Sequence, residues 1–300
     1  MCRKQYTRSV VGENKLLGKY SLLDAWVAEY TESMTQSIRW LQDEIATRML
    51  QKLDIVKLEP KDILLIPDFP GVHSSFLTKR FPGIRFHSAP ECELSGFNLF
   101  KLRATRFWNS RMKSASLISL DNYKKTGHIN LPSNSVDLVV SVLLIQDLAD
   151  PKHFLQECRR VLKEGGLLIF SYLGPDTAKE LRAEILAQEL PIQNLASPWD
   201  MHDMGDALLG ERFSDPVMDM EFLGLDYDSD SVLLSDARAL NLLGSDYQNS
   251  TIATQLPQKL TLEVVYGHAW ALGKNLAKAQ DDVAYIGLNQ IGRKTRNDPA

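Results

Sequence analysis

The feature that most constrains the fold is a short apolar run that leads at once into turn formers and then a helical pattern. Residues 63–66 read Ile-Leu-Leu-Ile, the length of a buried strand. Asp68 and Gly71 lie in the turn that follows, and residues 72–80 have apolar positions at helical spacing. A strand, a tight turn and a helix open a doubly wound α/β sheet, in which ligands bind over the carboxyl ends of the strands. We therefore expect this turn to border a ligand site.

Alternation of strand and helix patterns continues from residue 62 to residue 190. The expected strands are 63–66, 84–87, 116–120, 136–145, 167–172, 217–227 and 260–272, and the expected helices are 36–53, 72–80, 151–162, 177–190, 200–210 and 231–243. Thr177 followed by Glu180 predicts a capping box at one helix start. The pattern predicts an α/β fold with a doubly wound, mostly parallel sheet of seven strands, whose last two strands pair antiparallel at an edge.

Length and composition are those of an ordinary globular chain. The 300 residues are 24% charged, with a formal net charge of −4, which fits one large α/β domain and argues against a dedicated nucleic-acid binder. We expect an N-terminal extension over residues 1–35, the main domain over 36–275 and a tail over 276–300.

Cysteine usage and hydropathy bear on the compartment. Cys2, Cys92 and Cys158 are odd in number and far apart, which is typical of free thiols in a reducing compartment. The first residues lack the apolar segment of a secretory signal, and no stretch approaches the ~20 apolar residues that cross a bilayer. We expect a soluble, cytoplasmic protein with no membrane partner.

Two downstream segments carry a resemblance to a known family. Residues 131–141 (LPSNSVDLVVS) and 154–171 (FLQECRRVLKEGGLLIFS) resemble the fourth strand, helix and fifth strand of class I S-adenosylmethionine-dependent methyltransferases. Residues 173–177, 200–220 and 264–270 further resemble the biotin-pathway branch (BioC), which methylates the free carboxylate of malonyl-acyl carrier protein. The resemblance covers roughly residues 36–272. A mitochondrial complex I assembly factor shares this architecture, so membership alone does not fix the reaction.

The resemblance implies S-adenosylmethionine as cofactor, but the first turn departs from the family pattern. The family's acidic residue and alternate glycines fall on Leu65, Pro67, Phe69 and Gly71, so one glycine is kept. Pro67 has no N–H and a fixed φ, and Phe69 adds bulk where a ligand should lie. Each lost charged hydrogen bond costs about 1.5–3 kcal/mol, and two would weaken the cofactor by roughly 10² to 10⁴. Such a site binds weakly unless Asp68 or Glu91 substitutes for the missing acid.

Other cofactor-binding candidates follow the later strands. Glu91 is one residue from the position where the family places its ribose acid, and the alternative is a solvated loop charge. Asp121 matches the acid near the adenine, and the alternative is a helix cap or turn former. Gln146 is kept after the fourth strand, whereas the branch's Asn and Trp fall on Val142 and Asp147.

The acceptor chemistry that the resemblance implies needs no acid–base pair. A carboxylate with an ordinary pKa near 4 is already ionised at neutral pH, so methyl transfer depends on orientation, and we assign no catalytic residue. His202 and Arg212 are candidates for holding the substrate carboxylate, because an Arg fork matches that group. Asp200, His202, Asp203 and Asp206 include possible metal ligands, but methyl transfer needs no metal and we expect none.

The segment Lys101–Lys113 carries five basic residues, no acid, and the aromatic residues Phe107 and Trp108. It could dock an acidic acyl carrier protein or, with less support from the overall charge, RNA. The alternative, which we favour, is a solvated helix face with its aromatic residues packed inward.

Three functions stay open from the residues. The first is methylation of malonyl-acyl carrier protein with an atypical cofactor turn. The second is a catalytically silent homologue that binds the carrier protein or another pathway partner, which Pro67, Phe69, Val142 and Asp147 favour. The third and weakest is an assembly factor resembling the complex I protein.

Overall fold

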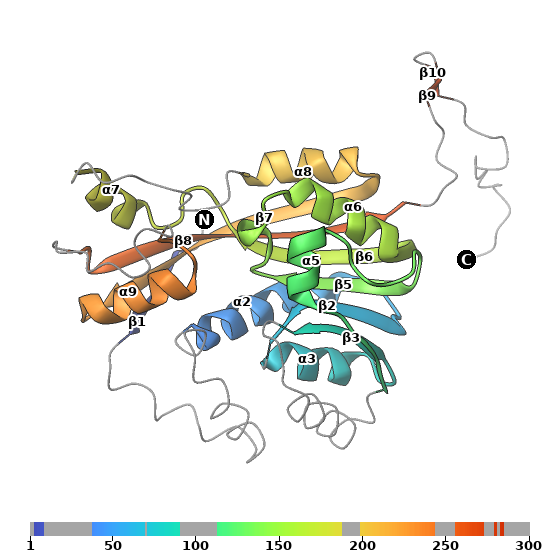
Figure 1. Cartoon of the computed structure of the whole chain (residues 1–300), viewed down its shortest axis with the longest axis horizontal. Helices are drawn as coiled ribbons and strands as arrows, with labels where there is room; N and C mark the ends of the chain where they lie inside the picture. Colours follow the sequence, from blue (N-terminus) through green and yellow to red (C-terminus); the bar gives the residue numbers. More distant parts are fainter. Residues whose placement is uncertain are drawn as a thin grey trace, which may run out of the picture.

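The described part of the chain is built around one mixed sheet of eight strands (Figure 1). The computed structural model describes residues 3–8, 38–69, 71–90, 113–187, 199–243, 256–272, 279–280 and 283–284. The strands are β1 (Arg3–Arg8), β2 (Asp62–Asp68), β3 (Arg85–Pro90), β4 (Lys113–Leu117), β5 (Val136–Val142), β6 (Leu162–Leu173), β7 (Phe213–Tyr227) and β8 (Lys259–Ala271). Their order is β1-β7-β8-β6-β5-β2-β3-β4.

The predicted fold class is confirmed. The seven expected strands are β2 to β8, and the strands from β4 across to β6 pair in parallel. The last two strands, β7 and β8, pair antiparallel as predicted, with β8 placed between β6 and β7. β1 pairs in parallel with β7 and adds an eighth strand that the sequence pattern did not indicate.

Helices cover both faces of the sheet. They are α2 (Arg39–Gln51), α3 (Val72–Arg80), α5 (Leu120–Thr126), α6 (Pro151–Val161), α7 (Lys179–Ala187), α8 (Met201–Gly210) and α9 (Asp230–Ala239), with short 3₁₀ turns η4 (Lys52–Ile55) and η5 (Ile145–Asp147) and a small hairpin of β9 (Ala279–Gln280) and β10 (Val283–Ala284). In Figure 1, α2, α3 and α9 lie on one side of the sheet and α5, α6 and α8 on the other. No helix among the described residues is both long enough and apolar enough to span a membrane.

Alternation along the strands divides the core into two layers. On β2, Ile63 and Leu65 pack into the cluster that contains α2, whereas Leu64 and Ile66 pack into the cluster that contains α6. Successive side chains of a strand point to opposite faces, so a strand that is apolar throughout is buried on both sides. This explains why these strands read as continuous apolar runs.

Two local predictions are wrong. The strand expected over residues 136–145 ends at Val142, because Leu143 takes a positive φ of 52° and turns the chain. The predicted capping box does not form, because the Thr177 hydroxyl bonds the backbone of Glu263 on β8 and the Glu180 carboxylate accepts from Thr261. Both side chains therefore fasten the start of α7 to β8.

The strand order reverses between β2 and β5. β3 and β4 follow on one side of β2, while β5 and β6 continue on the other. Such a reversal opens a crevice at the carboxyl ends of the two central strands, which is where ligands of doubly wound folds bind. The turn after β2 and the segment after β5 therefore border the candidate site.

Candidate functional site

Asp68 is the last residue of β2, and its carboxylate bonds other side chains of this chain. Its side chain is buried, and Oδ1 lies 3.1 Å from Nε2 of His73 on α3. The hydroxyl of Ser88 on β3 donates to Oδ2. The carboxylate thus ties β2, β3 and the first turn of α3 together, and both of its oxygens have protein partners.

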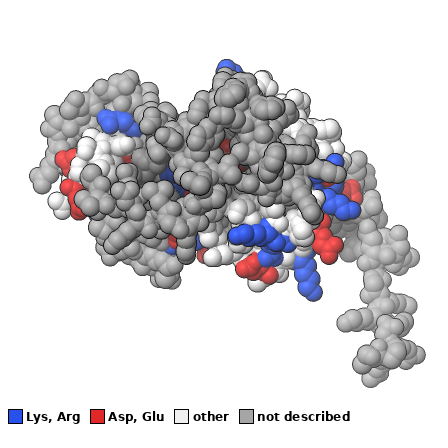
Figure 2. Space-filling model, turned by 90° about the horizontal axis from the view of Figure 1, so that it is seen from below, with Lys and Arg blue, Asp and Glu red and all other residues white. Residues whose placement is uncertain are grey.

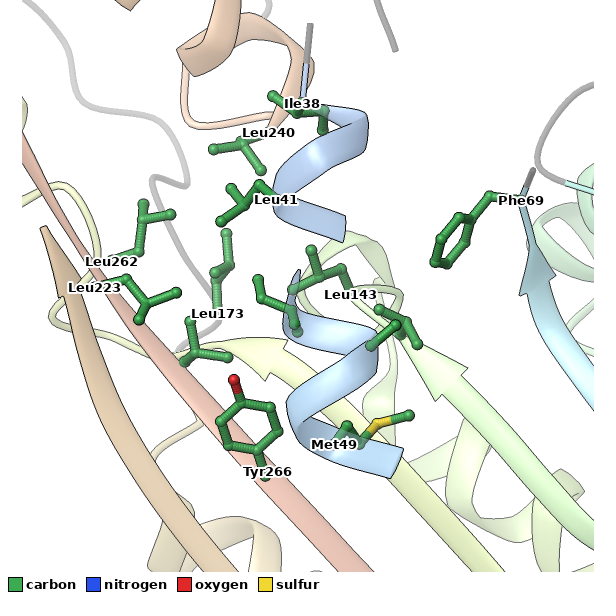
Figure 3. Packing of buried hydrophobic residues seen from close by; sticks show 14 of the residues in the cluster. Ile38, Leu41, Met49, Phe69, Leu143, Leu173, Leu223, Leu240, Leu262 and Tyr266 are labelled. Carbon is green, nitrogen blue, oxygen red and sulfur yellow. The ribbon is translucent and has the colours of Figure 1, made fainter. Parts of the chain in front are cut away.

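Phe69 follows directly and is 2% exposed. Its ring centroid lies 4.3 Å from that of His73, and the guanidinium carbon of Arg39 lies 5.6 Å from the Phe69 centroid. Figure 3 shows the ring turned from the end of β2 toward α2, within the same apolar cluster as Leu41. The bulk expected at this position is therefore packed beneath the first turns of α2.

Gly71 caps α3, and its neighbour Val72 donates its backbone N–H to Oδ1 of Asp43 on α2 at 3.0 Å. A Cβ built on Gly71 would lie less than 3.0 Å from both Asp43 Oδ1 and the Phe69 ring. Burial raises the pKa of the Asp43 carboxyl, and this effect outweighs the opposing Val72 N–H and the charges of His73 and Arg39. Side chains of this chain therefore occupy the space beside the turn.

This arrangement does not fit S-adenosylmethionine at the first turn. A cofactor there needs open space beside the glycine and backbone N–H groups that can donate to its carboxylate. The space beside Gly71 is filled by Asp43 and Phe69, and the Val72 N–H already has a carboxylate partner. Asp68, the predicted substitute for the family's acid, is engaged by His73 and Ser88.

Gln146 and Asp121 lie at the same edge of the sheet. Gln146 on η5 donates from Nε2 to the Leu143 carbonyl at 2.7 Å, and its Oε1 lies 3.4 Å from the backbone nitrogen of Leu173. It therefore joins the carboxyl ends of β5 and β6. Asp121 is exposed in the first turn of α5, and the helix cap is Ser119, which accepts from the Asn122 N–H. Asp121 is thus not a cap, and its carboxylate faces solvent.

His202 and Arg212 do not come together. The carbonyl of Asp200, which caps α8 just before His202, accepts from the hydroxyl of Tyr172 near the carboxyl end of β6. Arg212 follows the other end of α8, where its carbonyl accepts from Leu272, after the last residue of β8. The ten residues of α8 span about 15 Å. The two candidates therefore lie at opposite ends of α8 and do not face one carboxylate together.

Arg212 lies instead at the amino ends of the parallel strands. It lines a shallow hollow of about 410 Å³ together with Ser133, Asn134, Gln156, Arg159, Arg160 and Glu164. Burial lowers the pKa of the Arg159 guanidinium, and the charge of Arg212 adds to this. Arg212 therefore belongs to a basic group that faces away from the crevice.

A second hollow, of about 450 Å³, lies between α6 and α8. It is lined by Lys152, Trp199, Asp203, Asp206, Ala207 and Gly210. Asp200 accepts the backbone N–H groups of His202 and Asp203, so its carboxylate serves as a helix cap. Within the described ranges, no three His, Cys, Asp or Glu side chains are grouped as a metal site would require.

Glu91 and residues 101–112 of the basic segment lie outside the described residues, and its last residue, Lys113, begins β4. On the face shown in Figure 2, basic and acidic side chains of the described residues are interspersed. Two ion pairs join α2 and η4 to β7, Arg48–Glu221 and Lys52–Asp219, each at 2.6 Å.

Sequence reasoning missed Asp43 and His73. Asp43 occupies a polar position of an amphipathic helix, and its partner Val72 is 29 residues away. His73 is 1% exposed although it stands in a polar stretch. Neither contact has a sequence signal, because the Asp43 contact depends on how α2 lies against the turn and the His73 contact on how α3 folds back on the end of β2.

Comparisons with known proteins identify the family. A model described as "Methyltransferase domain" matches residues 108–170. A malonyl-[acyl-carrier protein] O-methyltransferase from Gallionella capsiferriformans is 32% identical over 77% of this chain and 83% of its own length. Malonyl-[acyl-carrier protein] O-methyltransferase 1 of Coxiella burnetii is 33% identical over 83% of this chain and 88% of its own length.

A solved structure from Bacillus halodurans, described as a candidate methyltransferase, is 13% identical with a TM-score of 0.50. It aligns over 77% of this chain and all of its own. That likeness supports the fold. The matches to the sequence relatives cover most of the chain, on both sides of the strand-order reversal. The chain belongs to the malonyl-[acyl-carrier protein] O-methyltransferase family.

Proposed function

We propose that this chain transfers a methyl group from S-adenosylmethionine to the free carboxylate of malonyl-acyl carrier protein, a step of biotin synthesis. The observation that carries the proposal is the identity of 32% and 33% to two malonyl-[acyl-carrier protein] O-methyltransferases over 83% and 88% of their lengths. A match confined to residues 108–170 would have indicated a methyltransferase-type domain alone.

The acceptor chemistry suits the groups at the carboxyl edge of the sheet. A malonyl carboxylate is ionised at neutral pH and needs no general base. The chain's task is to orient that carboxylate and exclude water. His202 lies at this edge, exposed in the first turn of α8, and is the substrate-binding candidate that we retain. Gln146 is retained as a structural part of the cofactor crevice, where it joins β5 to β6.

Acyl carrier protein is the partner that this function requires, and the cytoplasm is the expected location. We do not expect nucleic acid to bind, because the chain is acidic overall, with a net charge of −4. The segment Lys101–Lys113 stays a candidate docking face for the carrier protein.

Mass spectrometry of the carrier protein tests the proposal. Purified chain is incubated with malonyl-acyl carrier protein and S-adenosylmethionine, and the expected product is heavier by one methyl group. Acetyl-acyl carrier protein, which lacks the free carboxylate, is the matched control and should stay unmodified. Absence of the methyl ester would reject the proposal, and unchanged binding of the carrier protein in that case would support the silent homologue.

A further inference from the structure

The first turn of α3 receives a carboxylate from the chain itself. Helix N-termini bind anions because their first N–H groups lack partners within the helix. In doubly wound folds this particular terminus, after the first central strand, faces the ligand crevice. Here the Val72 N–H is held by Asp43 Oδ1 at 3.0 Å. Asp43 therefore stands where a carboxylate of a bound ligand would be received.

The space next to that carboxylate is filled as well. The Phe69 ring is 2% exposed and lies 2.8 Å from the point where a Gly71 side chain would begin. Arg39 covers the outer face of the ring, with its guanidinium carbon 5.6 Å from the centroid. One residue of the turn and two residues of α2 thus close the site together.

We propose that Asp43 and Phe69 form an internal latch on the cofactor turn, and that S-adenosylmethionine enters when these two side chains leave it. This inference rests on the proposed function, since it concerns the cofactor of the same site. The amino-acid carboxylate of the cofactor and the Asp43 carboxylate compete for the Val72 N–H. Two negative charges repel each other at such a short distance, so both cannot bind there at once. Cofactor binding is therefore coupled to displacement of Asp43.

The body of α2 stays in place when the latch opens. Leu41, Ile45 and Met49 are buried in the core, and the last turn is fastened to β7 through Arg48 and Glu221. The Asp43 side chain is half-buried, at the border between this apolar face and the crevice. Rotation of the Asp43 and Phe69 side chains frees the turn and breaks fewer core contacts than release of α2 would.

Calorimetric titration with S-adenosylhomocysteine tests the latch. Asp43→Ala removes the competing carboxylate and should lower Kd roughly ten- to hundredfold, the equivalent of one charged hydrogen bond. Asp43→Asn keeps the size and removes the charge, and should give a smaller gain. The control is Glu44→Ala, which removes the neighbouring carboxylate that pairs with Arg48 and should leave Kd unchanged.

Hydrogen exchange of the Val72 amide, followed by NMR without ligand, supplies the independent readout. Exchange should be at least tenfold faster in Asp43→Ala than in the parent chain or in Glu44→Ala. Equal exchange in all three chains shows that Asp43 does not hold this amide, and the latch is then overturned. Faster exchange with an unchanged or higher Kd also overturns it.

If the proposed function is wrong, the titration and exchange results differ from those that refute the latch alone. If no variant binds S-adenosylhomocysteine at millimolar concentration while the Val72 amide responds to Asp43→Ala, the cofactor assignment fails and the gating role with it. The contact between α2 and the turn would then be purely structural. A parent chain that binds as tightly as Asp43→Ala likewise refutes the latch.

Discussion

At the residue scale, the buried carboxylate of Asp68 shows how a candidate cofactor ligand can instead serve the fold. A carboxylate at the end of β2 is positioned for a ligand in the crevice, yet His73 and Ser88 are its partners here. A buried polar group must be paired, because an unpaired one costs about 1–3 kcal/mol. Both carboxylate oxygens of Asp68 are paired, and the two bonds fix β3 and α3 against β2.

We predict that Asp68→Ala destabilises the protein. The change leaves the Ser88 hydroxyl and the His73 imidazole without their acceptor, which costs about 1–3 kcal/mol for each buried group. Urea unfolding measures the loss. Asp54→Ala is the control, because Asp54 pairs with Arg80 at the surface and exposed ion pairs contribute about 0–1 kcal/mol. Equal losses in the two variants would contradict the role assigned to Asp68.

The bulk of Phe69 was evident from the sequence, but its consequence was not. A phenylalanine in a glycine position predicts crowding, and the buried ring confirms that the position is filled. The partner that completes the closure, Asp43, comes from a helix that precedes the strand by more than ten residues. Spacing predicts which face of a helix is apolar, but it does not predict which polar residue meets a turn.

At the element scale, α6 is fastened to the segment before β5 by Glu157. This buried carboxylate accepts the Ile129 N–H at 2.8 Å and pairs with Arg160, which in turn donates to the carbonyls of Ile129 and Leu131. Burial alone would raise the pKa of Glu157, but the bonds from Arg160 and Ile129 outweigh it and lower the pKa below its ordinary value of 4.5. The charged form therefore stabilises this connection.

We predict that Glu157 makes stability depend on acid pH. A lowered pKa in the folded state means that the stabilisation is present above about pH 4.5 and is lost as the pH falls through the folded value. Glu157→Gln should be less stable than the parent chain at pH 7, and the difference should shrink below pH 4.5. Urea midpoints across this range measure it, with the exposed Glu184→Gln as control. A constant difference at every pH would contradict the assignment.

The presence of a strand was predictable where the local pattern decides it, although its exact ends were not. Continuous apolar runs predicted β2, β5 and β6, because parallel strands buried on both faces need them. The capping box predicted at Thr177 does not form, because Thr177 and Glu180 hydrogen-bond to residues of β8, more than 80 residues later in the chain. Contacts over such separations override local preferences.

At the scale of the whole molecule, alternation of strand and helix is enough to predict the class of sheet and the edge that carries the site. It does not predict β1, because the first residues show no strand pattern, nor which end of α8 faces the crevice. Arg212 follows His202 by ten residues, which on a helix is the full length of α8 and carries Arg212 to the amino ends of the strands.

The proposed latch of Asp43 and Phe69 decides whether the cofactor turn is open to a ligand. A crystal structure of the chain grown with S-adenosylhomocysteine tests it most directly. We expect the ligand over the carboxyl ends of β2 and β5, its carboxylate at the Val72 N–H, and both latch side chains turned away. A structure with the ligand bound and Asp43 Oδ1 still 3.0 Å from the Val72 nitrogen would contradict the latch.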